Sequence, residues 1–204
     1  MVQLSASGLA KRFASNYIFK AVNLEAESGQ TVALLGPNGS GKSTLLQVLY
    51  GSTAPTLGVV SLLFDGKKIA EDEHFKLGSF CSPALWLPPD ITAAQFLGYH
   101  FSIRQPSIVV SAMLELVQLD RHAHKLISDY SSGMRQRLKL ALVLFDTCPI
   151  AYLDEPCTNL DASGIALYKA LFQEHLLGKL VFIASNDPQE YTAATISLLL
   201  SKYQ

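Results

Sequence analysis

The sequence predicts an α/β fold with a mostly parallel core sheet, an antiparallel β region near the N-terminus and an inserted helical lobe. Two observations support this prediction. Short apolar runs without alternation, typical of strands buried on both faces, recur along the chain and are followed by helical patterns. A proline-containing middle segment with helical spacing separates two such regions. The chain has 204 residues, 49% of them hydrophobic, which suits one domain with a small inserted lobe.

The first third of the chain shows the alternation of strand and helix most clearly. Thr31–Leu35 is rich in branched residues and predicts a strand, and Lys42–Tyr50, after a glycine-rich stretch, predicts a helix. A Pro/Gly turn over 55–58 precedes a predicted strand at Val59–Phe64 and a turn at Asp65–Gly66.

Residues 82–145 are expected to form the helical lobe, because prolines and helical spacing replace the strand pattern there. The lobe is predicted to end with a helix over Ser132–Phe145. An earlier helix is indicated by four apolar residues that share one face: Met113, Leu114, Val117 and Leu119.

The core, expected over residues 1–81 and 146–204, resumes after the lobe as part of one domain that spans residues 1–204. The predicted order is a buried strand at Ile150–Leu153, a helix at Ala162–Leu177, a strand at Leu180–Ala184 and a last strand at Thr195–Leu200.

Charge and composition narrow the possible partners and location. Charged residues make up 16% of the chain and the net charge is -1, so no basic stripe for nucleic acid is expected. No apolar run approaches the roughly 18–20 residues that span a bilayer, and the N-terminus lacks the pattern of a signal peptide. We therefore expect a soluble, cytoplasmic protein whose membrane role depends on a partner. Cys81, Cys148 and Cys157 match neither a zinc site nor a disulfide framework, and we expect small buried residues.

A glycine-rich segment between the first predicted strand and helix fits the phosphate-loop pattern G-x-x-x-x-G-K-[ST] at every defined position. Its glycines let backbone N–H groups converge on phosphates, and the following helix points its positive end at the same place. Lys42 is expected to reach the β- and γ-phosphates, Ser43 to ligate Mg²⁺, and Thr44 to support the α-phosphate. A glycine turn that merely precedes a helix is the structural alternative. The residues of the loop are Gly36, Pro37, Asn38, Gly39, Ser40, Gly41, Lys42 and Ser43.

Two adjacent acids, Asp154 and Glu155, end the buried strand at Ile150–Leu153. The strand carries them to the carboxyl edge of a parallel sheet, where ligands of such folds bind. Asp154 is suited to hold Mg²⁺, and Glu155 to activate the water that attacks the γ-phosphate. Capping of the next helix is the alternative role for these acids.

Two further motifs resemble those of the ATP-binding-cassette (ABC) ATPases. Tyr130–Arg137 reads Y-S-S-G-M-R-Q-R and resembles the family's signature sequence, L-S-G-G-Q, while 159–161 reads N-L-D and looks like its D-loop. The order and spacing of the four motifs match the family over essentially the whole chain. The resemblance implies a P-loop NTPase of the ABC-ATPase fold that binds ATP and Mg²⁺.

The resemblance also implies two partners, a second ABC subunit and a membrane-spanning permease. The two ATPase subunits would sit head to tail, with ATP between the phosphate loop of one and the signature of the other, and the permease would hold them peripherally at the inner face of the membrane. Phe13 matches the aromatic that stacks on adenine in the family, with Tyr17 as competitor. The remaining nucleotide contacts implied by the signature and D-loop are Ser131, Ser132, Gly133, Met134 and Asp161.

Four positions depart from the family pattern. Ser82 stands where the family has a metal- and water-contacting Gln, and Asn186 stands where it has the switch His. Asn186 can donate a hydrogen bond but cannot carry a proton or positive charge. In the signature, Ser132 and Met134 replace the usual residues. Since Lys42 and Glu155 are intact, we hypothesise a working ATPase with slow or differently tuned hydrolysis.

The preferred function is the ATPase subunit of an ABC transporter. The alternatives are a non-transport ABC protein, for which coiled coils, zinc modules and a basic face are missing, and a regulatory cassette with weak hydrolysis. A permease helix is expected to dock near Ser82–Leu97. The length is similar to that of the cytochrome-c-biogenesis ATPases, but the cargo is not encoded here. Four residues are expected to form an exposed apolar patch for docking: Leu85, Trp86, Leu87 and Ile91.

Overall fold

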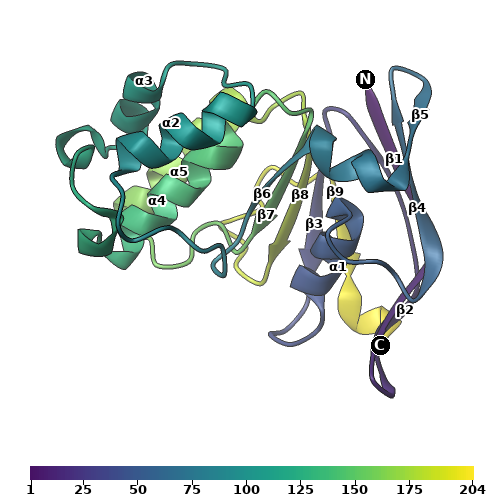
Figure 1. Ribbon diagram of the computed structural model, residues 1–204. Coiled ribbons are helices and arrows are strands. Elements are labelled where there is room, and N and C mark those ends of the chain that lie inside the picture. The colour runs from purple at the N-terminus through teal and green to yellow at the C-terminus, as the bar shows by residue number, and fades with distance from the viewer.

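The computed structural model describes all 204 residues and contains two sheets with helices beside and between them (Figure 1). The five-stranded sheet has the order β6-β7-β8-β3-β9 and is parallel at every pairing. The α/β prediction is therefore confirmed, and the antiparallel strands form a separate sheet. The five strands are β3 (Thr31–Leu35), β6 (Gly78–Cys81), β7 (Ile150–Asp154), β8 (Leu180–Ser185) and β9 (Ile196–Leu199).

The second sheet is the expected antiparallel region near the N-terminus. It has the order β2-β1-β4-β5 and is antiparallel throughout. Inward-facing residues of β1 alternate with exposed ones, as a sheet with one solvated face requires. Its strands are β1 (Val2–Phe13), β2 (Asn16–Glu27), β4 (Leu57–Phe64) and β5 (Lys67–Ile69).

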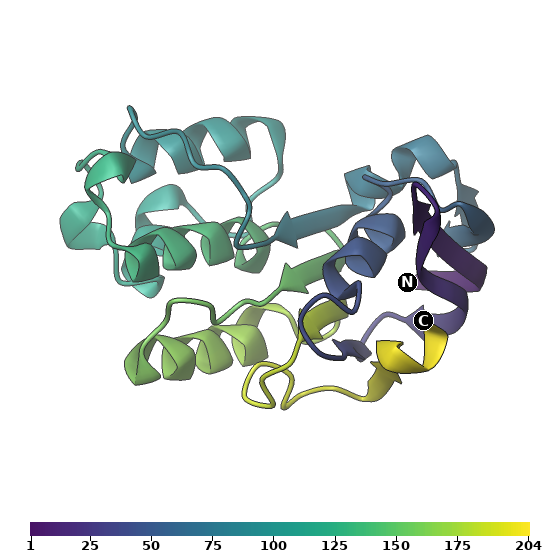
Figure 2. The same ribbon diagram turned by 90° about the horizontal axis from the view of Figure 1, so that it is seen from below.

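Helix α1 (Lys42–Tyr50) lies between the two sheets (Figure 1). Its buried leucines and apolar residues from both sheets form one hydrophobic core. On the other side of the parallel sheet, a second core joins β7 and β8 to four helices. These are α2 (Ala93–Ile103), α3 (Val110–Leu116), α4 (Ser132–Leu144) and α5 (Ala162–His175). Seen from below, these helices lie together on one side of the strands (Figure 2).

The segment 82–145 carries three of these helices and no strand, in agreement with its predicted helical character. The four residues expected to share one helical face are all buried, although the helix itself ends at Leu116. Gln95 fixes the start of α2. Its side chain accepts from the Thr92 N–H while its own N–H donates to the Thr92 hydroxyl, and the two bonds form a capping box.

Several predicted boundaries differ from the structure by one or two residues; α4, for example, ends at Leu144 rather than Phe145. Helix α5 ends at His175 rather than Leu177, because Leu176 leaves the helix and Gly178 turns the chain with φ +91°. The last strand ends at Leu199, and Leu200 begins a 3₁₀ turn over Leu200–Tyr203 that packs near the phosphate loop. Of the three cysteines, Cys81 and Cys157 are buried as expected, while Cys148 is half-buried. No helix of the structure is both long and apolar enough to span a bilayer.

Candidate nucleotide site

The carboxyl ends of four neighbouring parallel strands bring the predicted site residues to one edge of the sheet. In strand order, β6 leads to Ser82, β7 to Asp154 and Glu155, β8 to Asn186, and β3 to the phosphate loop. These segments are far apart in sequence, and only the strand order makes them neighbours. This edge is where parallel α/β folds bind ligands.

The phosphate loop connects β3 to α1 and depends on glycine at its last turn. Gly41 is the N-cap of α1 with φ +95°, and a Cβ there would lie 2.3 Å from Cγ2 of Ile18. Both the left-handed backbone and the contact exclude any other residue. No side chain caps α1, so its first N–H groups remain available for an anion.

Lys42 is buried against the loop that precedes it. Its ammonium donates to the carbonyls of Gly36 (2.8 Å) and Pro37 (3.2 Å), which hold the positive charge at the N-terminus of α1. Ser40 folds back over Gly36: a Cβ on that glycine would lie 2.6 Å from the Ser40 hydroxyl oxygen. This hydroxyl is buried and has no hydrogen-bond partner. The loop thus concentrates positive charge and donors in one place, as phosphate binding requires.

Ser43 and Asp154 meet across the site, since the Ser43 hydroxyl donates to Oδ1 of Asp154 at 2.9 Å. Burial raises the pKa of Asp154, and adjacent Glu155 raises it further, while Ser43 and Lys42 act in the opposite direction. A hydroxyl and a carboxylate within hydrogen-bond distance form a hard oxygen pair of the kind that Mg²⁺ prefers. The residues present therefore fit the metal that the sequence predicts.

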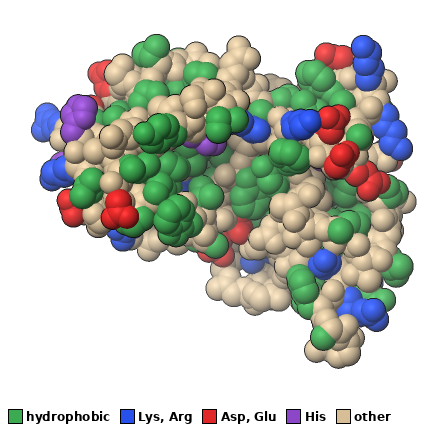
Figure 3. Space-filling model, in the orientation of Figure 1, with side chains coloured by type: hydrophobic (Ala, Val, Ile, Leu, Met, Phe, Trp, Pro, Cys, Tyr) green, Lys and Arg blue, Asp and Glu red, His purple; other side chains and the backbone are tan.

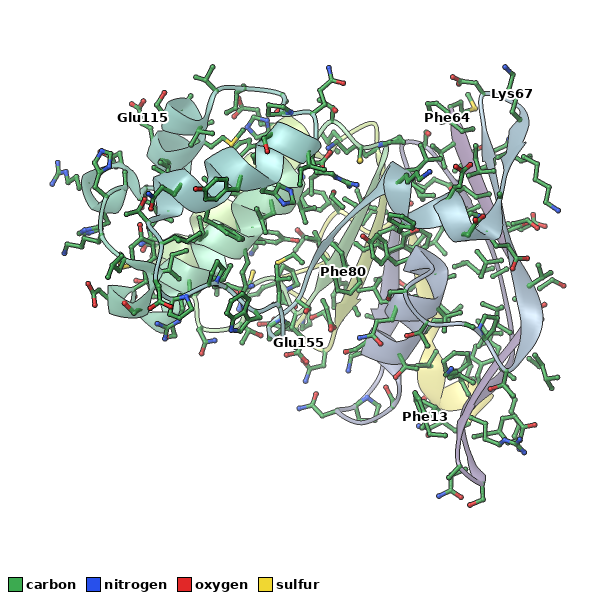
Figure 4. All side chains as sticks on the ribbon, viewed as in Figure 1. Phe13, Phe64, Lys67, Phe80, Glu115 and Glu155 are labelled. Atoms are coloured by element: carbon green, nitrogen blue, oxygen red, sulfur yellow. The ribbon has the colours of Figure 1, made fainter.

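Glu155 is the most constrained residue of the site. It has φ +44°, a left-handed conformation that is uncommon for a side-chain-bearing residue. Its N–H donates to the Ala184 carbonyl at 2.9 Å, and its Oε2 accepts from the Thr158 hydroxyl at 3.2 Å. Figure 4 shows Glu155 in the space between the helical lobe and α1. Thr158 was not identified from the sequence, where it reads as an ordinary residue of the loop.

Asn186 faces the phosphate loop. Its exposed side-chain Nδ2 donates to Oδ1 of Asn38 at 3.3 Å, so the two loops touch through their amides. Ser82 lies at the end of β6 and is buried. Both residues lie at the carboxyl edge of the parallel sheet.

Glu190 is a buried acid that was not identified from the sequence. Its Oε1 accepts from the Cys157 N–H at 2.7 Å, which connects the segment after β8 to the segment after Glu155. Burial raises the pKa of Glu190, whereas the Ser185 hydroxyl and the Cys157 N–H lower it. A lone Glu in a loop gives no sequence signal of this buried role.

The signature and D-loop segments lie in contact within the chain. A Cβ on Gly133 would lie 3.1 Å from the Asn159 carbonyl oxygen, so the signature glycine allows this close approach. Ser131 is the N-cap of α4 and accepts from the Met134 N–H at 3.2 Å, while neighbouring Ser132 is exposed. Both serines are accessible at the start of a helix.

Asp161 is the N-cap of α5, a role that the sequence suggested only for Asp154 and Glu155. Its Oδ1 accepts from the Gly164 N–H at 2.8 Å and from the Ser163 hydroxyl at 2.9 Å. The Gly164 N–H is the main reason that the pKa of Asp161 is lowered.

Phe13 ends β1 beside the hairpin turn and is 53% exposed (Figure 4). The Lys11 ammonium lies 5.0 Å from its ring centroid and covers part of the ring. Tyr17 is less exposed, and its ring is flanked by Arg12 and Lys20 at 5.7 and 4.5 Å. Phe13 therefore offers the more accessible ring for stacking.

A groove of about 590 Å³ lies between α1 and the helical lobe, away from the residues described above. Figure 3 shows apolar side chains gathered over the lobe and in the hollow beside it. Trp86 is 72% exposed, but Leu87 is buried in the lobe core, so its predicted place in an exposed patch was wrong. Tyr99 and Ile103 of α2 add exposed apolar surface beyond the predicted patch.

Comparison with known proteins shows the family of the chain. Residues 19–158 match the sequence model of the family described as ABC transporter. This chain belongs to the ABC transporter ATP-binding family. It is 37% identical over 79% of its length to the uncharacterized ABC transporter ATP-binding protein YxlF of Bacillus subtilis, of which it spans 55%. It is 34% identical to the cytochrome c biogenesis ATP-binding export protein CcmA of Nitrobacter winogradskyi, over 90% of this chain and 91% of CcmA.

The fold of the ABC cassette is confirmed by a solved structure. A dimeric ATP-binding cassette in a post-hydrolysis state, bound to ADP and phosphate, superposes with a TM-score of 0.76 at 24% identity, covering 97% of this chain and 94% of that one. The family match and the shared fold together identify the chain as an ABC ATPase subunit.

Proposed function

We propose that this chain is the motor of an ABC transporter that pairs head to tail with a second ATPase subunit and drives a separate membrane-spanning subunit from the cytoplasmic face. The observation that carries the proposal is the convergence of Lys42, the Ser43–Asp154 pair and constrained Glu155 at one sheet edge. The CcmA relatives, of similar length, are named as export proteins.

In the proposed reaction, a water oxygen attacks the γ-phosphorus of ATP, the bond to the β-phosphate oxygen breaks, and ADP and phosphate leave. Lys42 and the N–H groups of the phosphate loop hold the β- and γ-phosphates. Glu155 orients the water and accepts its proton, while Asn38 and Asn186 border the γ-phosphate position. Ser43 and Asp154 would hold Mg²⁺, which neutralises charge on the phosphate oxygens when bound, with Ser82 at the neighbouring strand end.

Pairing with a second subunit is supported by the signature residues. Ser131, Ser132 and Gly133 stand at the start of α4, where hydroxyls, N–H groups and the helix dipole can receive a γ-phosphate from a partner subunit. Met134 and Asp161 complete the surface that the family resemblance assigns to the shared nucleotide. The structural neighbour bound to ADP and phosphate is itself dimeric. Phe13 stacks on the adenine of the chain's own nucleotide in this proposal.

The membrane partner is assigned to the groove beside α2. Exposed Trp86 and Ile103 line it, together with Tyr50 of α1 and Phe80 of β6. An exposed apolar groove of this kind fits the apolar face of a partner helix. The cargo is chosen by that partner rather than by this chain.

Slow or tuned hydrolysis is the second part of the proposal. Ser82 and Asn186 replace two groups that position water and phosphate in the family, while the groups that bind and cleave ATP are present. Removing one such positioning group typically costs about 10²–10³ in rate. A regulatory cassette with weak hydrolysis is the competing function that this observation favours.

The test is Mg-ATPase activity measured against protein concentration, with Glu155→Gln as control. Activity that rises faster than linearly and disappears in the control supports a self-pairing motor. Activity that stays flat and near zero while ATP still binds refutes a self-sufficient motor and favours the regulatory cassette or pairing with a different subunit. Mixing with the membrane subunit then separates those two.

A further inference from the structure

Helix α4 carries two long polar side chains that are buried and that no part of the proposed mechanism uses. Gln136 is 2% exposed and Lys139 is 8% exposed. Being three residues apart, they share one face of the helix. Helix α4 packs against β6, and this face reaches the loops at the carboxyl edge of the sheet.

Gln136 holds the residue that follows the catalytic glutamate. Its Nε2 donates to the Pro156 carbonyl at 2.8 Å. Glu155 itself adopts a left-handed conformation, and such strained residues persist only where their surroundings fix them. The Gln136 bond is therefore one of the contacts that set where the Glu155 carboxylate points.

Lys139 contacts the loop that follows β6, the strand beside β7. Its ammonium donates to the carbonyl of Pro83, the residue that follows Ser82. Lys139 takes part in none of the ion pairs of the structure. Burial lowers the pKa of Lys139, and the Pro83 carbonyl is the partner of its ammonium. A buried charge held only by a carbonyl is costly, which indicates a role other than stability.

We propose that Gln136 and Lys139 are positioning residues that fix the Glu155 and Ser82 loops to the signature helix. Ser131 caps the same helix, so one helix connects the signature to both loops. The inference rests on the proposed function for its catalytic meaning.

The first test compares turnover of Lys139→Met and Gln136→Met with the wild type. Each substitution keeps a long side chain and removes the donor. We expect kcat to fall about tenfold or more, since small displacements of reacting groups cost at least this much, with the affinity for ATP close to that of the wild type. Lys139→Arg, which retains a cationic donor, should recover most of the rate.

Lys179→Met is the matched control. Lys179 also donates to a backbone carbonyl, that of Asp146, and burial also lowers its pKa, but it precedes β8 at the opposite edge of the sheet. It should lose thermal stability without losing kcat. Equal losses of kcat in Lys139→Met and Lys179→Met, or wild-type kcat in both α4 variants, overturn the proposal.

A second test needs no turnover, because Trp86 is the only tryptophan and lies three residues after Pro83. Its fluorescence anisotropy reports the mobility of this segment. The anisotropy should drop in Lys139→Met and stay unchanged in Lys139→Arg and Lys179→Met, and no drop in Lys139→Met overturns the inference. If the wild type lacks Glu155-dependent hydrolysis, the self-pairing motor is refuted, and the anisotropy alone then decides whether Lys139 holds the loop.

Discussion

Replacing Asp154 by Asn should stabilise the nucleotide-free protein and remove its response to Mg²⁺. The carboxyl is 6% exposed and burial raises its pKa, which means that the folded state disfavours the charged form. An amide oxygen can still accept from the Ser43 hydroxyl 2.9 Å away. The substitution therefore relieves the cost of a buried charge while it keeps the hydrogen bond, and it removes the anion that a divalent cation needs.

The magnitude follows from ligand linkage. At a concentration 100 times the dissociation constant, Mg-ATP stabilises the wild type by about 2.7 kcal/mol. For a domain of this size each kcal/mol moves Tm by about 2–4 °C, so the wild-type shift should be roughly 5–11 °C. In Asp154→Asn the shift with Mg-ATP should equal the shift with ATP and EDTA, and the apo Tm should lie above that of the wild type.

The assay is thermal unfolding with no ligand, with ATP plus EDTA and with Mg-ATP. Asp161→Asn is the matched control, because Asp161 is an exposed helix cap with a lowered pKa, and its apo Tm should not rise. A lower apo Tm in Asp154→Asn would show that burial does not penalise the carboxylate, and a retained magnesium-dependent shift would show that the carboxylate is not a metal ligand.

Three further predictions concern single side chains. Asn186→His should raise kcat at least about tenfold by restoring a positioning group, and an unchanged kcat in a folded variant counts against tuning at this position. Phe13→Ala should weaken equilibrium ATP binding by about 1–2 kcal/mol through lost stacking, whereas Phe13→Tyr should bind as the wild type does; equal affinities for all three proteins rule out stacking. Because the pKa of Glu190 is raised in the folded state, the native protein binds the proton more tightly than the unfolded chain, and stability falls as pH rises through the folded pKa. Urea unfolding at several pH values should therefore show Glu190→Gln gaining stability relative to the wild type as pH rises from about 4.5, and a constant difference contradicts this.

Much of the site could be predicted because its chemistry is local in sequence. The phosphate loop needs glycines, a lysine and a serine within eight positions, and β3 and α1 have the residue ranges that the apolar pattern predicts. The acids Asp154 and Glu155 end a strand whose continuous apolar run indicates burial on both faces. Patterns of this kind can be recognised in the sequence without any knowledge of tertiary contacts.

The contacts that hold the site together are not visible in the sequence. Gln136, Lys139 and Glu190 are polar residues that normally lie at the surface, and only the packing of α4 and of the segment after β8 buries them. The burial of an apolar residue can also be mispredicted. Leu87, beside exposed Trp86, was expected at the surface and is buried in the lobe core. Pattern gives the type of an element, whereas the tertiary packing decides which side of a loop faces inward.

The position of β3 has a consequence for how the chain is made. This strand pairs with β8 on one side and β9 on the other. The backbone groups on both its edges therefore stay unpaired until residues near the C-terminus have been synthesised. At about 5–20 residues per second, the ribosome needs roughly ten to thirty seconds between the end of β3 and the end of β9. During that interval an apolar strand with two unpaired edges is a target for misassembly and for chaperones. A chain that ends before β9 would contain the whole phosphate loop, but β3, which carries the loop, would lack its pairing partner β9.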